Sequence, residues 1–467
     1  MADTFVDQPW QPIGTKFIVD NPRCMLVADP GMGKTAMTLK ALKILHMCGS
    51  SFFPALILAP KRVAEVVWDG EVRRWDVFKD LSVLKVIGER EARMAALKSS
   101  IADIYVCNYE NAPWLVEQFG GSKWPFKIVV ADESPRLKSF RLNKGGQRAE
   151  ALGKIARFTG RWLNLTGTPM PNGEQDLWGQ MWFVDFGERL KRSYTAYMDA
   201  YFKENPYSRK ITCLPGQEAV IQELVKDRVM SLLAEDWLPL DKPQIIPVEV
   251  VLPPKALIQY KQMEKEFFTT VSEREIETAV EAGTAAAKSS KMMQIASGSI
   301  WDENSMPHKI HEAKVEGLAD IVEQTNGAPL VVAYWWKFDP PRIIEAFPKA
   351  KVYSGPQDEA AFNAGKIPML LLNWNSAYGL NLARNCRDLV CYSYWWNAEL
   401  WTQMLDRIGP VRQYQVGKKC VVRIWQIIAQ DTIDDGVIAS NARKITMETA
   451  FKRARARRKN GEQTDVA

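Results

Sequence analysis

The chain has 467 residues, 46% of them hydrophobic, which at ordinary domain sizes is enough for roughly two to four domains with cores of their own. No apolar run reaches the ~18 residues of a membrane-spanning helix, and the first residues lack the basic and apolar regions of a signal peptide, so we expect a cytoplasmic protein. The net charge of +6 permits a polyanionic partner without demonstrating one, and the seven scattered cysteines, none in a CxxC pair, argue against zinc sites and disulfide frameworks.

Short apolar runs alternate with helix-length segments over residues 1–184. Each run is compact and bounded by polar or turn residues, which is typical of buried strands. The runs are residues 25–28, 55–59, 104–107, 128–131 and 162–165. This alternation predicts an α/β fold in which helices cover both faces of a parallel sheet.

The middle of the chain has a different pattern. Residues 185–243 carry charged and aromatic residues at helical spacing until Pro239 and Pro243 interrupt it, so we expect a helical insertion followed by a linker. Residues 244–252 alternate like a strand, and a second helical insertion is expected at about 255–300.

Strand–helix alternation resumes near residue 328, which predicts a second parallel-sheet lobe over residues 244–467. The expected strands of this lobe are residues 329–333, 350–353, 369–372, 389–392 and 421–425. The chain ends in a basic tail, with six Lys or Arg among residues 452–459. Such a tail could grip phosphates or be a solvated end, and the sequence favours neither.

A glycine-rich loop, Asp29-Pro-Gly-Met-Gly-Lys-Thr35, joins the first expected strand to a helix-length segment. Gly31 and Gly33 would let successive backbone N–H groups face one anion, and the start of the helix adds its positive end. Lys34 would reach the β- and γ-phosphates of a nucleotide, and Thr35 would ligate Mg²⁺. The order strand, loop, helix predicts that this loop, Asp29 included, binds a nucleoside triphosphate.

Two adjacent acids follow the expected strand 128–131. Asp132 at the strand end can hold Mg²⁺ through water, and Glu133 can orient or deprotonate the attacking water. A capped helix start would also explain an Asp-Glu pair, but its place downstream of the phosphate loop favours catalysis. The pair indicates hydrolysis rather than phosphoryl transfer to a metabolite.

With these two elements in place, the first lobe resembles helicase superfamily 2, and within it the Swi/Snf-type DNA translocases. The resemblance rests on Asp132–Lys138, on Leu165–Asn172 with the following Asp176–Trp178, on Ala59–Lys61, on Asn108–Glu110 and on Trp10-Gln11. In that family the segment like 165–172 couples the two lobes, and an aromatic-Gln pair contacts adenine. The resemblance therefore implies that Trp10 and Gln11 also bind ATP.

The second lobe resembles the same family. The matching segments are Lys291–Gly298, His311–Lys314, Leu372–Ser376, Gly379–Asn381, Trp395–Asn397, Trp401–Gln403 and Asp406-Arg407. The family's motif like Ser376 and Gly379 faces both DNA and nucleotide, and its closing motif supplies an arginine finger. The fold that the resemblance implies is two RecA-like lobes with helical insertions between and within them.

The sequence departs from the family in three places. The His of the acidic box is replaced by Pro135, so coupling through that side chain is lost. The two arginines of the closing motif normally share one helical face, whereas here Pro410 lies between Arg407 and Arg412. Arg407 is the first choice for the finger and Arg412 the second. Residues 230–236, expected to be basic, are acidic.

The resemblance implies a DNA-dependent ATPase that uses ATP and Mg²⁺ to move along double-stranded DNA. Its contacts would be mainly to the DNA backbone. The candidate contacts are Lys61, Asn108, Tyr109, Ser376, Trp335 and Trp396. Core packing is the alternative for both tryptophans, because the chain has 17 of them.

Compact relatives of this kind resemble those of phages and bacteria. That context would place the protein in the cytoplasm of a bacterial or phage-infected cell, as a monomer working beside replication or recombination proteins. Two alternative functions are a strand-separating DNA helicase, for which no wedge hairpin is evident, and an ATP-switched DNA-binding module with weak hydrolysis.

Overall fold

The computed structural model divides into two compact units, which are described separately. The first unit contains Met1–Pro239 together with Thr446–Ala467, and the second contains Leu240–Ile445. The structure describes residues 3–49, 52–99, 101–142, 145–204, 211–273, 280–302, 304–376 and 380–454.

The first unit is built on a seven-stranded sheet in the order β3-β4-β2-β5-β6-β1-β9, in which every neighbouring pair is parallel. Its strands are β1 (Arg23–Ala28), β2 (Ala55–Ala59), β3 (Val83–Val86), β4 (Ile104–Asn108), β5 (Ile128–Asp132), β6 (Arg161–Thr166) and β9 (Val229–Leu232). Every residue of β2, β4 and β5 is buried, as expected for parallel strands covered on both faces. The parallel sheet predicted for this lobe is confirmed.

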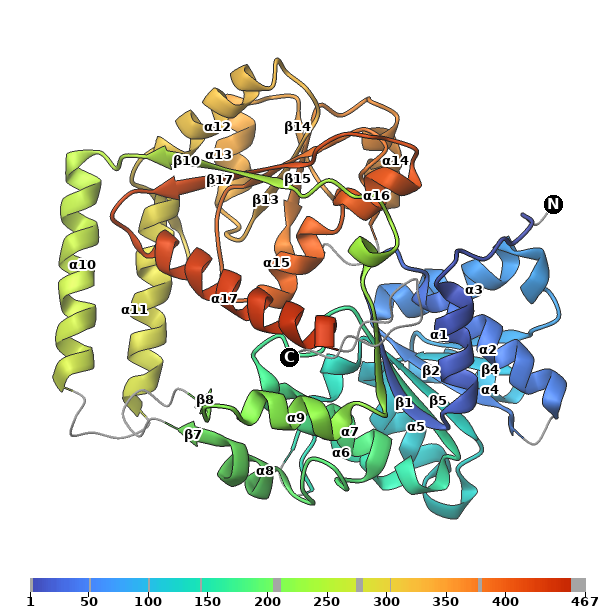
Figure 1. Cartoon of the computed structure of the whole chain (residues 1–467). Helices are drawn as coiled ribbons and strands as arrows, with labels where there is room; N and C mark the ends of the chain where they lie inside the picture. The colour runs from blue at the N-terminus through green and yellow to red at the C-terminus, as the bar shows by residue number, and fades with distance from the viewer. Residues whose placement is uncertain are drawn as a thin grey trace. The chain divides into compact units, whose positions relative to one another are not determined.

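Helices surround this sheet (Figure 1). They are α1 (Gln11–Asp20), α2 (Lys34–Cys48), α3 (Lys61–Arg74), α4 (Arg90–Ser99), α5 (Ala112–Phe119), α6 (Gln147–Ile155) and α7 (Leu177–Asp185). All residues of α7 but its last are buried, and stacked aromatic rings anchor it to the sheet. The rings of Trp162 on β6 and Phe183 on α7 are stacked with centroids 4.6 Å apart.

Residues 185–243 are only partly helical. They contain α8 (Tyr194–Tyr201), the hairpin of β7 (Phe202–Glu204) and β8 (Ile211–Cys213), α9 (Gln217–Val225) and strand β9. We expected a helical insertion followed by a linker, but the largely apolar run 229–232 pairs in parallel with β1 and is buried at every position. A short apolar run does not reveal from periodicity alone whether it forms helix or strand.

The second unit contains a six-stranded sheet in the order β10-β17-β16-β13-β15-β14, again with parallel neighbours throughout. Its strands are β10 (Gln244–Val250), β13 (Leu330–Tyr334), β14 (Ala350–Val352), β15 (Met369–Asn373), β16 (Asp388–Cys391) and β17 (Arg423–Ala429). Pro247 lies in β10, an edge strand, where its missing N–H is tolerated. The predicted second α/β lobe is therefore confirmed.

Two long helices, α10 (Pro254–Glu273) and α11 (Val280–Ser297), form the insertion expected at about 255–300 and pack side by side (Figure 1). The other helices of this unit are α12 (Ala313–Gln324), α13 (Asp339–Ala346), α14 (Pro356–Asn363), α15 (Ala398–Leu405) and α16 (Pro410–Gln415). A small hairpin joins β11 (Ser299–Trp301) to β12 (Pro307–Lys309). Helix α17 (Ile433–Ala454) begins in the second unit, and its residues from Thr446 on belong to the first.

A buried ion pair fixes α12 in the second unit. The ammonium of Lys314 donates to Asp434 at 2.6 Å, and the same carboxylate oxygen accepts the N–H of Ala429 at 3.1 Å. Lys314 is wholly buried. A charge taken out of water is tolerated only with such partners, so the pair ties α12 to the end of β17.

The parallel arrangement decides where a site can form. The carboxyl ends of parallel strands lie at one edge of a sheet, and ligands bind outside that edge. In the first unit β5, β6, β1 and β9 are consecutive neighbours, so the segments that follow them in the sequence meet. Within the described residues, no helix is both long enough and apolar enough to cross a membrane.

Candidate functional site

The phosphate loop follows β1 and ends at the start of α2. Gly31 and Gly33 have φ of +87° and +81°, a backbone conformation that residues other than glycine rarely adopt. A Cβ atom on Gly33 would also collide with the amide nitrogen of Gln11. The loop is therefore a narrow backbone cradle at a helix N-terminus, the arrangement that binds phosphate groups.

Trp10 and Gln11 support this loop from the N-terminal side. The indole N–H of Trp10 donates to the carbonyl of Met32 at 2.8 Å, and the side-chain oxygen of Gln11 accepts the N–H of Gln8 at 2.9 Å. Both side chains are buried. The structure thus brings the pair to the phosphate loop, and its contact with adenine stays a prediction.

Lys34 lies where the ends of three strands meet. Its ammonium donates to the carbonyl of Ala28 at 2.6 Å, and a Cβ on Gly167 would lie 3.5 Å from it. Burial lowers the pKa of Lys34, and the nearby carboxylates of Glu133 and Asp132 act in the opposite direction. The lysine, the acidic pair after β5 and the turn after β6 therefore form one cluster.

The acidic pair occupies the end of β5. Asp132 accepts the indole N–H of Trp68 at 3.1 Å. Burial raises the pKa of Asp132 to about 6, while Lys34 and the Trp68 hydrogen bond act to lower it. Glu133 has φ of +58°, a left-handed conformation that few non-glycine residues adopt and that is common at functional sites. These residues fit a phosphate site with a divalent cation, because Thr35 and Asp132 offer the oxygen ligands that Mg²⁺ prefers.

A buried amide connects the acidic pair to the Thr-Gly-Thr-Pro turn. The hydroxyl of Ser134 donates to the side-chain oxygen of Gln180 at 2.8 Å. The amide nitrogen of Gln180 donates to the carbonyls of Pro169 at 2.7 Å and Asp176 at 2.9 Å. This link through Ser134 joins the segment after the acidic pair to the turn after β6.

Neither this link nor the role of Trp68 is predicted by the sequence patterns. Both join segments far apart in the sequence: Ser134 and Gln180 are 46 positions apart, and Trp68 and Asp132 are 64 positions apart. The only signal available was the polar Gln180 within the otherwise apolar run 177–184, a position that needs a buried partner.

The two candidate finger arginines lie in the second unit. Arg407 is buried, and its guanidinium donates to the carbonyls of Gln403 at 2.6 Å and Leu380 at 3.3 Å. Arg412 is half-buried in α16, which starts at Pro410, and it donates to the side chain of Gln415 at 3.1 Å. Burial lowers the pKa of Arg412. Both assignments stay predictions.

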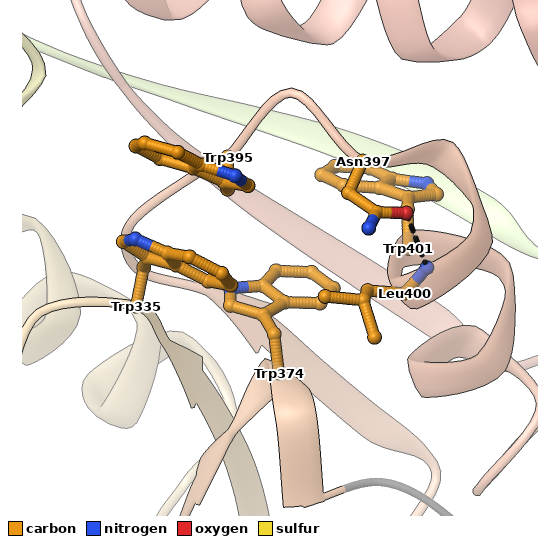
Figure 2. Close-up of a pocket in the computed structure, with 6 residues that line it drawn as sticks. All are labelled: Trp335, Trp374, Trp395, Asn397, Leu400 and Trp401. Carbon is orange, nitrogen blue, oxygen red and sulfur yellow. Dashed lines mark hydrogen bonds between the residues drawn. The ribbon is translucent and has the colours of Figure 1, made fainter. Parts of the chain in front are cut away.

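A cluster of tryptophans lines a small pocket in the second unit (Figure 2). Trp335 stacks on Trp395 with centroids 4.8 Å apart, and Trp374 stacks on Trp401 at 5.3 Å. The indole N–H of Trp374 donates to the carbonyl of Ser393 at 2.8 Å. One face of the Trp335 ring is thus covered by Trp395, which supports core packing as the role of this residue.

The residues predicted to contact DNA differ in exposure. Lys61 and Ser376 are exposed, whereas Trp335 and Trp396 are half-buried. Asn108 is buried and donates to Glu110 at 2.8 Å.

Tyr109 is wholly buried in the core of the first unit. Packing in this core accounts for the Tyr109 ring, and its contact with DNA stays a prediction. Gly379, predicted to face the nucleotide, lies outside the described residues.

Comparisons with known proteins agree with this geometry. A family model described as SNF2-related domain matches residues 18–299. Protein p41 of Acyrthosiphon pisum secondary endosymbiont phage 1 is 43% identical over 470 residues, which cover 97% of this chain and 100% of that protein. The human SWI/SNF-related matrix-associated actin-dependent regulator of chromatin subfamily A member 1 is 24% identical, over 91% of this chain and 41% of its own length.

A solved structure, the Sulfolobus solfataricus SWI2/SNF2 ATPase core in complex with dsDNA, matches with a TM-score of 0.43 and 16% identity. The match covers 96% of this chain and 93% of that chain.

The Gln180 link predicts a measurable loss of stability. Replacing Gln180 by Leu leaves the Pro169 carbonyl, the Asp176 carbonyl and the Ser134 hydroxyl short of a partner inside the first unit. We expect the free energy of unfolding of this unit to fall by about 2–4 kcal/mol in urea denaturation. Gln175→Leu is the matched control, because Gln175 makes one exposed hydrogen bond and should lose about 1 kcal/mol or less. Equal stability of the two variants would show that the link is not needed.

Proposed function

The chain belongs to the SNF2-related domain family, and on that premise we propose that it is an ATP-driven motor that moves along double-stranded DNA. Membership assigns the chain to the ATPases of helicase superfamily 2, as the ordered motifs predict. The observation that carries the proposal is the cluster at the end of the first sheet, where the phosphate loop, Lys34, Asp132 and Glu133 come together.

Each residue of the cluster has a role in hydrolysis. The backbone of the phosphate loop and Lys34 would hold the triphosphate, and Thr35 and Asp132 would hold Mg²⁺, which offsets the phosphate charge. Glu133 would accept the proton of the attacking water as that water bonds to the γ-phosphorus and the bond to the β-phosphate oxygen breaks. The left-handed backbone at Glu133 supports this role because it fixes the direction of that side chain.

The second unit would supply a further positive charge, the guanidinium of an arginine. A guanidinium on the γ-phosphate stabilises the transition state and is worth about 10³–10⁵ in rate in related enzymes. Arg407 or Arg412 would provide it, so that hydrolysis depends on the approach of the second unit. Hydrolysis would in this way be coupled to movement of one unit relative to the other. If both units also hold DNA, that movement would shift the chain along it.

Exposed groups at strand ends support DNA as the track. Lys61 follows β2 in the first unit, and Ser376 follows β15 in the second. Both suit contacts with phosphate and sugar, which position a protein without reading sequence. Several relatives are named as ISWI chromatin-remodelling complex ATPases, yet the chain spans about 40% of their length, so only the motor core is proposed here.

Loss of the general base should abolish turnover without abolishing nucleotide binding. We expect duplex DNA to raise the rate of phosphate release by the wild-type chain, and Glu133→Gln to lower that rate by about 10²–10⁴. ATP affinity, measured by calorimetry, should stay within a few-fold because Gln is isosteric. Glu117→Gln, which neutralises an exposed acid on α5, should behave as wild type. Unchanged hydrolysis in Glu133→Gln would refute the assigned base.

The finger can be identified by comparing two alanine variants. We expect Arg407→Ala to reduce turnover about 10³-fold or more with little change in ATP affinity. Because Arg407 also binds two backbone carbonyls, the melting temperature of each variant is needed to separate catalysis from unfolding. If only Arg412→Ala loses turnover while remaining folded, Arg412 is the finger.

A further inference from the structure

The last described residues of α17 bring a second ammonium group to the phosphate loop. Lys452 lies in the part of α17 that belongs to the first unit, and it donates to Asp29 Oδ1 at 3.0 Å. It also pairs with Glu448 on its own helix at 3.4 Å. Only 7% of Lys452 is exposed, so solvent screens this pair far less than a surface pair. The first basic residue of the C-terminal tail is therefore bound inside the unit.

Asp29 is held on its other side by the chain that follows β9. Its Oδ2 accepts the N–H of Ala234 at 3.0 Å, and its own N–H donates to the carbonyl of Leu232 at 3.1 Å. Burial acts to raise the pKa of Asp29, but Lys452 and the Ala234 N–H outweigh it and leave the pKa below its ordinary value. The first residue of the phosphate loop is thus a charged carboxylate.

A carboxylate at this place opposes the binding of an anion. A triphosphate seated on the loop would meet the negative charge of Asp29 in surroundings from which water is partly excluded, where charges interact strongly. The ion pair with Lys452, an ammonium that Glu448 also shares, offsets that charge locally. The contact joins residues 423 positions apart, so the C-terminal helix takes part in the electrostatics of a site near the N-terminus.

We infer that Lys452 is a positioning residue of the ATP site, which neutralises Asp29 so that the phosphate loop can accept the triphosphate. The inference rests on the proposed ATP site, and Lys452 acts through Asp29 rather than by touching the nucleotide. It follows that removing the Lys452 charge alone weakens ATP binding. Removing the charges of Asp29 and Lys452 together restores that binding.

The neighbouring residue provides a matched control. Arg453 donates to Glu235 at 2.8 Å, but the two side chains are 59% and 47% exposed. Exposed pairs contribute little, so removing this charge should leave the phosphate loop unaffected. Lys452 and Arg453 thus lie side by side on one helix, and only Lys452 is paired with the loop.

The test measures binding of Mg²⁺–ATP by calorimetry in the full chain, in a Glu133→Gln background that prevents turnover. We expect Lys452→Met to raise the dissociation constant about tenfold or more, and Lys452→Arg to restore most of the affinity. Asp29→Asn should bind at least as tightly as the background, and Asp29→Asn/Lys452→Met should return to within about threefold of it. Arg453→Gln should change the constant less than twofold.

The outcomes separate the role of Lys452 from the existence of the ATP site itself. Failure of the background chain itself to bind Mg²⁺–ATP would remove the proposed function. Normal affinity in Lys452→Met, or no recovery in the double variant, would overturn the inference alone and assign Lys452 a purely structural role. If Lys452→Met does not fold, Asp29→Asn carries the test, and a tenfold loss of affinity in that variant would contradict charge neutralisation.

Discussion

The candidate site depends on the balance of charge around the partly buried ammonium of Lys34. Lys34 is placed at the meeting point of three strand ends, where burial disfavours its charge and the carboxylates of Asp132, Glu133 and Asp29 favour it. None of these groups could be buried alone, because an isolated charge out of water is costly. The parallel sheet makes the balance possible by delivering the lysine that follows β1 and the acids at the end of β5, on either side of β6, to one edge. An incoming triphosphate with its cation would change that balance, and this change would be the physical basis of the proposed nucleotide dependence.

The same constraint explains several contacts that surround the site. Trp68 holds Asp132, the Gln180 amide links the acidic pair to the turn after β6, and Lys452 offsets Asp29. The Trp68 and Lys452 contacts each hold a carboxylate in place, and the Gln180 contact holds the segment that follows Glu133. A motor needs such fixed directions, because a displaced general base loses rate steeply with distance.

Much of the fold could be predicted because its signals are local. Buried parallel strands appear as short apolar runs, and the phosphate loop and the acidic pair each occupy a few consecutive residues. The predictions of two parallel sheets and of long helices near 255–300 needed nothing more. Strand β9 was missed because its four residues, three of them apolar, lie within a helical pattern, and only pairing with β1 reveals the strand.

The supporting contacts of the site could not be predicted because their signals are not local. The partners of Trp68, Gln180 and Lys452 are remote in the sequence, and no spacing rule connects them. Burial is equally hidden, since Asn108 and Tyr109 have the appearance of an exposed turn, yet both are buried and Tyr109 packs in the core. The basic tail looked uniform in sequence, whereas the structure distinguishes a buried Lys452 from an exposed Arg453.

Displacement of a triplex-forming strand from duplex DNA is the decisive test of translocation, because it requires movement along an intact duplex. We expect the wild-type chain to remove the third strand only when it hydrolyses ATP, and to leave a forked duplex unseparated. Separation of the fork without triplex displacement would contradict translocation and identify a strand-separating helicase. ATP consumption with neither effect would contradict the motor altogether.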